Sequence, residues 1–113
     1  MSVRLRLDKP WQALTAETAA RLPGQLGVYQ VADASGTLLF IGHAGARSPF
    51  GLRSELQREF AERGAGCQFR VEVNQQYRTR WLELLMVHQA DHGSLPADNA
   101  KNPPPNLGRL SPN

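Results

Sequence analysis

The segment that most constrains the fold of this chain is GVYQVADASGTLLFIG, residues 27–42. Its two apolar runs, 26–32 and 37–41, are separated by Asp-Ala-Ser-Gly, a composition typical of a tight turn. The second run is apolar without alternation, which is typical of a strand covered on both faces. The segment therefore predicts a β-hairpin whose second strand is central in its sheet, followed by a loop of small residues at 42–46.

The middle of the chain predicts two helices and one further strand. Residues 50–63 place Leu52, Leu56 and Phe60 four positions apart, which predicts an amphipathic helix. Residues 67–73 alternate between apolar and polar side chains, which predicts a strand at the edge of the sheet with one wet face. Residues 77–93 predict a helix closed by glycine, with apolar residues on nearly every side, so that we expect it to be largely buried.

The two ends of the chain carry weaker signals. Residues 15–23 predict a short helix capped by Thr15, with Thr18 at the capping-box position, and residues 3–7 alternate like a short strand. The segment 101–113 is rich in proline and asparagine. We therefore predict one α+β domain at 1–100, with a small three-stranded antiparallel or mixed sheet flanked by helices, and a separate tail at 101–113.

Composition limits the classes of protein that fit. The 113 residues are 41% hydrophobic and 20% charged, typical of a globular protein, and no apolar run approaches the length of a membrane span. The chain begins without a signal-peptide pattern, and the single Cys67 excludes an intramolecular disulfide, so we expect a cytoplasmic protein without a membrane partner. Its formal net charge is +3, and all but two of its 13 basic residues are arginine. Arginine binds phosphate in a bidentate manner, although a GC-rich genome would produce the same bias.

Five elements appear in a recognisable order, and together they resemble the GIY-YIG nuclease domain from about Leu22 to about Asn99. They are Gly27-Val28-Tyr29, Phe40-Ile41-Gly42, a helical Arg53, a helical Glu83 and Asn99. The resemblance implies a metal-dependent endonuclease that cleaves the phosphodiester bonds of DNA, with branched or damaged DNA among the candidate targets.

The resemblance also implies a role for each matched residue. Tyr29 would help to activate the attacking water, Arg53 would hold the scissile phosphate, and Glu83 would bind one Mg²⁺ or Mn²⁺ ion. Asn99 would support the site, with Asn102 and Asn106 as rivals for that role. A single carboxylate holds such an ion weakly, so that water and substrate phosphate would supply most of its ligands.

The chemistry of the same residues leaves alternatives open. Tyrosine has a pKa of about 10 and is a poor base unless nearby positive charge lowers it, so Tyr29 could equally serve packing. Arg53 could simply cover a solvated helix face. Glu83 interrupts an apolar helix, where a carboxylate is costly unless it meets a metal ion or an ion pair with Arg80 or Arg78.

Phe40 departs from the resemblance, because a tyrosine normally begins the second tripeptide. The loss of one positioned hydroxyl can lower a rate by a factor on the order of 10². His43 is a candidate to replace it, or else caps the loop. The alternative function is therefore a catalytically weak or inactive nucleic-acid-binding module of the same fold. A third is an interaction domain that docks through its proline-rich tail. So short a chain has little room for a separate targeting domain, so we expect specificity to come from this domain, a homodimer or a partner protein.

Two other patterns predict no chemistry. His88 and His92 have the spacing of a helical zinc site, but position 89 is glutamine and lacks the glutamate of the HExxH motif. The glycines at 42 and 45 are not followed by the Gly-Lys-Ser/Thr ending of a phosphate-binding P-loop.

Overall fold

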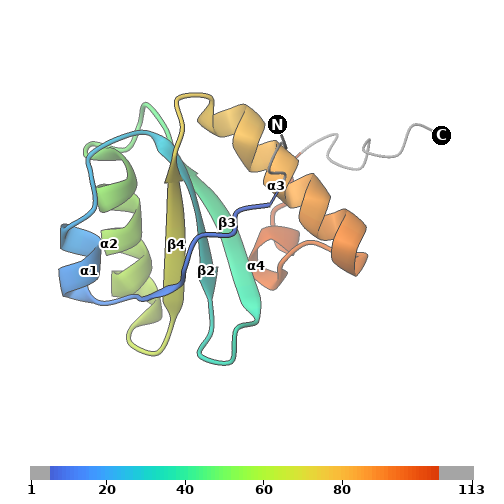
Figure 1. The fold of residues 1–113 in the computed structure, drawn as a ribbon, viewed down its shortest axis with the longest axis horizontal. Coiled ribbons are helices and arrows are strands. Elements are labelled where there is room, and N and C mark those ends of the chain that lie inside the picture. Colours follow the sequence, from blue (N-terminus) through green and yellow to red (C-terminus); the bar gives the residue numbers. More distant parts are fainter. Residues whose placement is uncertain (1–5, 105–113) are drawn as a thin grey trace.

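The computed structural model describes residues 6–104 and shows an α+β domain, as predicted. In chain order its elements are β1 (Gln12–Ala13), α1 (Ala16–Ala20), β2 (Gly27–Ala32), β3 (Leu38–Ala44), α2 (Gly51–Arg63), β4 (Gln68–Val73), α3 (Tyr77–His92) and α4 (Ala97–Ala100). The strands form one antiparallel sheet in the order β1-β4-β2-β3, with α1 and α2 on one face and α3 on the other (Figure 1). The predicted count of three strands was wrong, because the two-residue β1 pairs with Phe69 and Gln68 of β4.

The predicted hairpin is confirmed, but its second strand is longer and lies elsewhere in the sheet. β3 continues through the segment expected to be a loop and ends at Ala44. It forms the edge of the sheet rather than its centre, because it pairs only with β2. Leu38, Phe40 and Ile41 are covered by helices packed on the two faces, which explains why the strand is apolar throughout.

The strand predicted at the edge is an inner one. β4 lies between β1 and β2, and its alternation is as expected. Phe69 and Val71 join the apolar cluster under α1 and α2, whereas Arg70 and Glu72 form side-chain contacts on the opposite face. The face expected to be wet is therefore only partly exposed, because α3 and the N-terminal residues supply it with partners.

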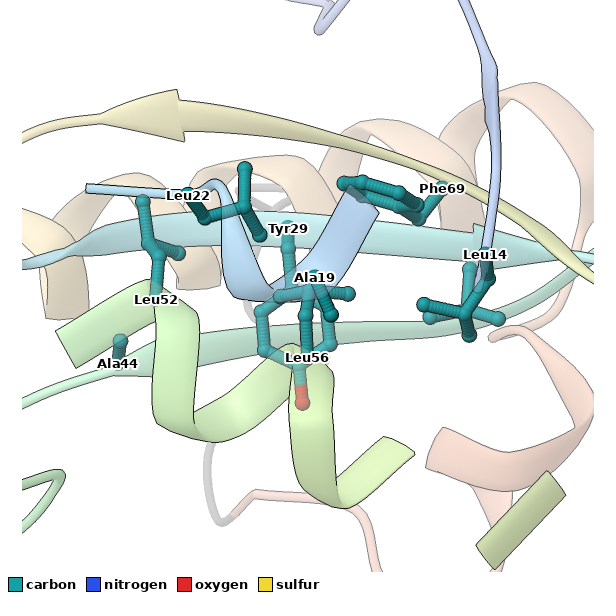
Figure 2. Packing of buried hydrophobic residues seen from close by; sticks show 9 residues of the cluster. Leu14, Ala19, Leu22, Tyr29, Ala44, Leu52, Leu56 and Phe69 are labelled. Atoms are coloured by element: carbon teal, nitrogen blue, oxygen red, sulfur yellow. The ribbon is translucent and has the colours of Figure 1, made fainter. Parts of the chain in front are cut away.

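The apolar core lies mainly between the sheet and the α1/α2 pair. Leu14, Leu52, Leu56 and Phe69 surround the ring of Tyr29 there, and all are fully buried (Figure 2). The capping box of α1 is confirmed, since the Thr15 side chain accepts from the Thr18 backbone N–H and Thr18 reaches back to Thr15. The capping box stabilises the first turn of α1, and Ala19 joins this helix to the same apolar cluster as Leu52 and Leu56 of α2.

α3 covers the other face of the sheet and is less buried than predicted. It ends at Gly93, which adopts the left-handed conformation expected of a helix cap. Of its side chains, only Arg80, Leu84 and Leu85 are buried. The apolar residues around the rest of the helix are half-exposed, because only one side of α3 meets the sheet.

The short α4 closes the outer edge of β3. Asn99 is only 4% exposed, its Oδ1 accepts from the Ile41 N–H (2.8 Å), and its Nδ2 donates to the Ile41 carbonyl (3.0 Å). The Trp81 indole donates to the same carbonyl at 2.8 Å. The side-chain amide thus replaces a neighbouring strand at the centre of an otherwise unpaired edge.

The ends of the predicted domain are only partly described. Of the strand predicted at 3–7, residues 3–5 lie outside the described part, and neither Arg6 nor the buried Leu7 belongs to a strand. The tail is described only as far as residue 104, so Asn106 lies outside it. Within 6–104, no helix combines the length and apolar character needed to cross a membrane.

Candidate functional site: a cationic pocket at the edge of the sheet

A pocket of about 550 Å³ opens at the C-terminal end of β3, between α2 and the start of α3. We call it the Gly42 pocket. It is lined by Tyr29, Phe40, Gly42, His43, Gly45, Ala46, Arg47, Ser48, Glu55, Arg58, Tyr77, Arg78 and Trp81. Because β3 is an edge strand, side chains from both faces of the sheet reach this one hollow. Of the predicted site residues, Tyr29 and His43 meet here, whereas Arg53, Glu83 and Asn99 do not line it.

Two glycines give this pocket its aromatic lining. Gly42 stands opposite Tyr29 in the β2–β3 pair, and a Cβ at Gly42 would lie 2.4 Å from the Tyr29 ring. A Cβ at Gly45 would lie 2.7 Å from the ring of Tyr77. Any side chain at either position would displace a ring, so the small residues of this segment make room for two phenols.

His43 is held between aromatic rings with one nitrogen unused. Its ring stacks on Tyr77 (centroids 5.5 Å apart) and meets Trp81 edge-on (4.7 Å). Its Nδ1 is buried and has no hydrogen-bond partner among the described residues. Burial, reinforced by the positive charge of Arg78, lowers the pKa of His43, so the ring is neutral at pH 7. Because Nδ1 is fully enclosed, Nε2 is the ring nitrogen that a ligand in the pocket could reach.

Three arginines line the same pocket. Arg58 is committed to carboxylates, with Nη2 2.6 Å from Glu55 Oε1, and this hydrogen bond raises its pKa. Arg47 and Arg78 are exposed, and neither forms an ion pair with a carboxylate in the stretch 6–104. These two guanidinium groups therefore give the mouth of the pocket a positive charge that no described side chain neutralises.

The surroundings of the Tyr29 hydroxyl do not suit a general base. Tyr29 is 1% exposed, and its hydroxyl donates to Glu59 Oε2 at 2.7 Å. Burial and the neighbouring Glu59 charge raise the pKa of Tyr29 well above its usual value of 10. The phenol stays protonated at neutral pH, and it forms part of the pocket wall.

Arg53 forms contacts that stabilise the fold. Its Nε donates to the Leu22 carbonyl at 2.9 Å, and its guanidinium lies 5.8 Å from the centroid of the exposed Phe50 ring. These contacts tie the first turn of α2 to the segment that follows α1. The predicted role of Arg53 on a phosphate stays a prediction.

Glu83 pairs with a neighbouring arginine, one of the two alternatives open from the sequence. Its Oε1 accepts from Arg80 Nη1 at 2.6 Å, and Arg80 Nε also lies 2.9 Å from Glu72 Oε2. Glu83 follows Trp81 by two positions, hence about 200° around the helix axis, away from the Gly42 pocket. Tyr29 packs in the α1/α2 cluster on the opposite face of the sheet, so the sheet separates it from Glu83.

The donor set around Glu83 does not fit a resident Mg²⁺ or Mn²⁺ ion. Such ions need several oxygen ligands, whereas the Glu83 carboxylate already meets the guanidinium of Arg80. Nowhere within residues 6–104 do three or more His, Cys, Asp or Glu side chains form a group that could hold a metal ion. We therefore derive no chemical step through a metal.

Some residues that line the pocket were not predicted from the sequence. Tyr77 and Arg78 open α3 and come to the pocket because that helix begins beside the end of β3. Glu59 does not line the pocket, but as the partner of Tyr29 it could have been noticed, because it falls three residues after Leu56 and seven after Leu52, on the buried stripe of its helix. An acid at such a position needs partners, and here Tyr29 and Arg63 supply them.

The fold and the pocket together define a small α+β domain with a cationic, aromatic-lined hollow at the edge of its sheet. The chain belongs to the family described as a domain of unknown function, DUF7508, whose model matches residues 5–91. No curated protein and no solved structure matches the chain. The match covers β1 to most of α3, and so includes every element that lines the Gly42 pocket.

Proposed function

We propose that this domain is a nucleic-acid-binding module of GIY-YIG type that holds phosphate groups of a DNA strand in the Gly42 pocket. The observation that carries this proposal is the meeting of Arg47 and Arg78 with Tyr77 and His43 around one hollow. Guanidinium groups grip phosphate oxygens in pairs, and aromatic rings offer stacking surfaces to bases.

The neutral His43 supports this proposal. A phosphate oxygen would accept a hydrogen bond from Nε2–H of the neutral ring, since Nε2, unlike Nδ1, is not fully enclosed. The Tyr77 hydroxyl lies beside Gly45 in the same pocket and is a second donor.

The endonuclease implied by the resemblance remains a prediction, and the residue geometry supports it less well than binding. Tyr29 donates its proton to Glu59 rather than to the pocket, and Glu83 is paired with Arg80 outside it. We therefore propose binding that does not depend on Mg²⁺ or Mn²⁺. A partner protein or a second copy of the chain would then supply any specificity or chemistry.

Fluorescence anisotropy with a labelled branched DNA would test this proposal at several salt concentrations, in EDTA and in Mg²⁺. We expect equal affinity in both buffers and an affinity that falls steeply with salt. The Arg47→Gln/Arg78→Gln variant should bind tenfold or more weakly. The slope of log K against log salt should fall by about 2, since two phosphate contacts are lost.

A matched control removes the same charge elsewhere. Arg21 and Lys101 are exposed and do not line the Gly42 pocket, so the Arg21→Gln/Lys101→Gln variant should bind within a factor of about three of the unmodified chain. Equal loss in both double variants would contradict a localised site. Cleavage in Mg²⁺ that disappears in Glu83→Gln would replace our proposal with the endonuclease.

A further inference from the structure

A second and larger pocket, of about 900 Å³, lies on the α3 side of the sheet. We call it the Arg70 pocket. Its walls come from the N-terminal residues, the β2–β3 turn, α3 and the segment leading into α4. Much of the lining is apolar, including Leu7, Leu38, Leu84, Val87 and Leu95. Its volume is within the range of small-molecule sites, roughly 300–1,000 Å³.

Arg70 brings a positive charge to this apolar hollow. Its Nε donates to Gln30 Oε1 (2.8 Å), its Nη1 donates to the Lys9 carbonyl (3.1 Å), and its guanidinium lies 4.1 Å from the centroid of the Trp11 ring. None of these partners is a carboxylate. The negative charge of Asp8 acts on Arg70, but burial still lowers the pKa of Arg70, so Asp8 balances this charge only in part. The guanidinium is held in a fixed plane against Trp11.

Gln30 adds an unused donor beside that charge. It is only 5% exposed, and it lines the pocket. Arginine can only donate, so the Gln30 atom that meets Arg70 must be the oxygen, which leaves the Nε2 amide group for other partners. In the described part of the chain Nε2 has no hydrogen-bond acceptor. Nε2 is not among the fully buried atoms that lack a partner, so it meets the solvent in the pocket, where the acceptor of a ligand could replace water.

The other charged groups of the pocket do not cancel this charge. Asp91 is engaged by Arg6, whose Nη2 lies 2.7 Å from Asp91 Oδ1. His88 and His92 lie together on the α3 side, with ring centroids 4.4 Å apart, and carry no negative charge. The pocket therefore combines apolar walls with one arginine that no carboxylate of the pocket lining pairs with, and one amide donor that is open to solvent.

We propose that the Arg70 pocket binds a small amphipathic carboxylate. Its carboxylate would meet the Arg70 guanidinium and the Gln30 amide, and its apolar body would lie along Leu38, Leu84 and Leu95. This site is independent of the Gly42 pocket. The two lining sets share no residue.

Two-dimensional NMR can test this site because the chain has only two tryptophans, and each pocket contains one of them. Decanoate and the uncharged decanol would be titrated separately, below the concentration at which micelles form. We expect decanoate to shift the indole N–H signal of Trp11 and the amide signals of Thr37 and Ser94, and to leave the Trp81 indole unchanged. Decanol should bind at least tenfold more weakly.

Two variants separate loss of charge from loss of fold. Arg70→Met should reduce decanoate affinity tenfold or more, to about that of decanol, while Arg47→Met, the matched loss in the other pocket, should leave it unchanged. If the NMR signals of Arg70→Met are poorly dispersed, which would indicate loss of the fold, Ala97→Phe is used in its place. Ala97 is exposed at the rim, so a larger side chain there narrows the entrance without disturbing the core.

The outcomes decide the proposal. Decanoate binding that is stronger than decanol binding, reported by Trp11, and lost in Arg70→Met or Ala97→Phe supports it. Equal affinity for the two probes, an unchanged Trp11 signal at millimolar decanoate, or a fully folded Arg70→Met that binds decanoate normally would overturn it. None of these results depends on whether the domain binds DNA.

Discussion

The two faces of the sheet differ in what fills them. The α1/α2 face is closed by buried apolar side chains around Tyr29 (Figure 2), and its main polar contact is the Tyr29–Glu59 pair. The α3/α4 face mixes a smaller apolar cluster with the Arg80–Glu72 and Arg70–Gln30 contacts, and it leaves the larger pocket open. The comparison suggests that the first face provides most of the stability, while the second face and the edge of β3 are available for binding.

The largest effect expected from this comparison is at Leu56. Leu56→Ala should lower the free energy of unfolding by about 2–5 kcal/mol, because it leaves a cavity in a fully buried cluster. The half-buried Leu82 on α3 is the matched control, and Leu82→Ala should be clearly milder. Urea denaturation measures both. Equal losses would show that the two faces contribute alike.

Tyr29→Phe tests the polar contact between β2 and α2 on the first face. Removing the hydroxyl leaves the Glu59 carboxylate, itself 3% exposed, without its hydrogen bond from β2. We expect a loss of about 1.5–3 kcal/mol, typical of a hydrogen bond to a charged group. DNA affinity should stay unchanged, because this hydroxyl points to Glu59. Strongly weakened DNA binding by Tyr29→Phe, with stability unchanged, would show that the Tyr29 hydroxyl takes part in DNA binding.

Asn99→Ala tests how the edge of the second face is closed. It leaves the Ile41 N–H without its acceptor, and we expect a loss of about 1–3 kcal/mol. Asn102→Ala, in the following turn, should have almost no effect, since Asn102 is exposed. Hydrogen exchange at the Ile41 amide should be faster in Asn99→Ala. An unchanged rate would contradict the account of the edge.

The smallest effect concerns pH, since each pocket contains one histidine with a lowered pKa. Burial is the main cause for both His43 and His88. Such groups bind more protons in the unfolded chain, so stability should be complete above pH 6.5, the usual pKa, and decrease as pH falls below it. Tm should therefore decrease between pH 7 and pH 5, less in His43→Asn than in the unmodified chain. A Tm that rises toward pH 5 in the unmodified chain but not in His43→Asn would contradict these shifts.

Much of the fold could be predicted from the sequence because helices and strands leave periodic patterns. The i, i+4 spacing of Leu52, Leu56 and Phe60 located α2, and the alternation from Phe69 to Val73 located β4 with the correct faces. The order of the strands could not be read in this way. Leu38 and Ile41 are covered because helices lie over them, and the sequence pattern cannot distinguish this from a position between two strands.

The site was less predictable because it depends on contacts between distant segments. Glu83 had two open alternatives, and only the geometry shows that Arg80 is its partner. The four-residue α4 has no periodic signal, yet it carries Asn99 to the edge of β3. The Gly42 pocket required knowledge that α3 begins beside the end of β3, which brings Tyr77 and Arg78 to His43.

The most direct test of the proposed function is the NMR spectrum of the chain titrated with a short single-stranded DNA. We predict that the indole N–H signal of Trp81 and the amide signals of His43 and Arg78 will shift with saturation, while the indole signal of Trp11 stays in place. Shifts confined to the exposed surface of α1, or a Trp81 signal that does not move at saturating DNA, would contradict binding in the Gly42 pocket.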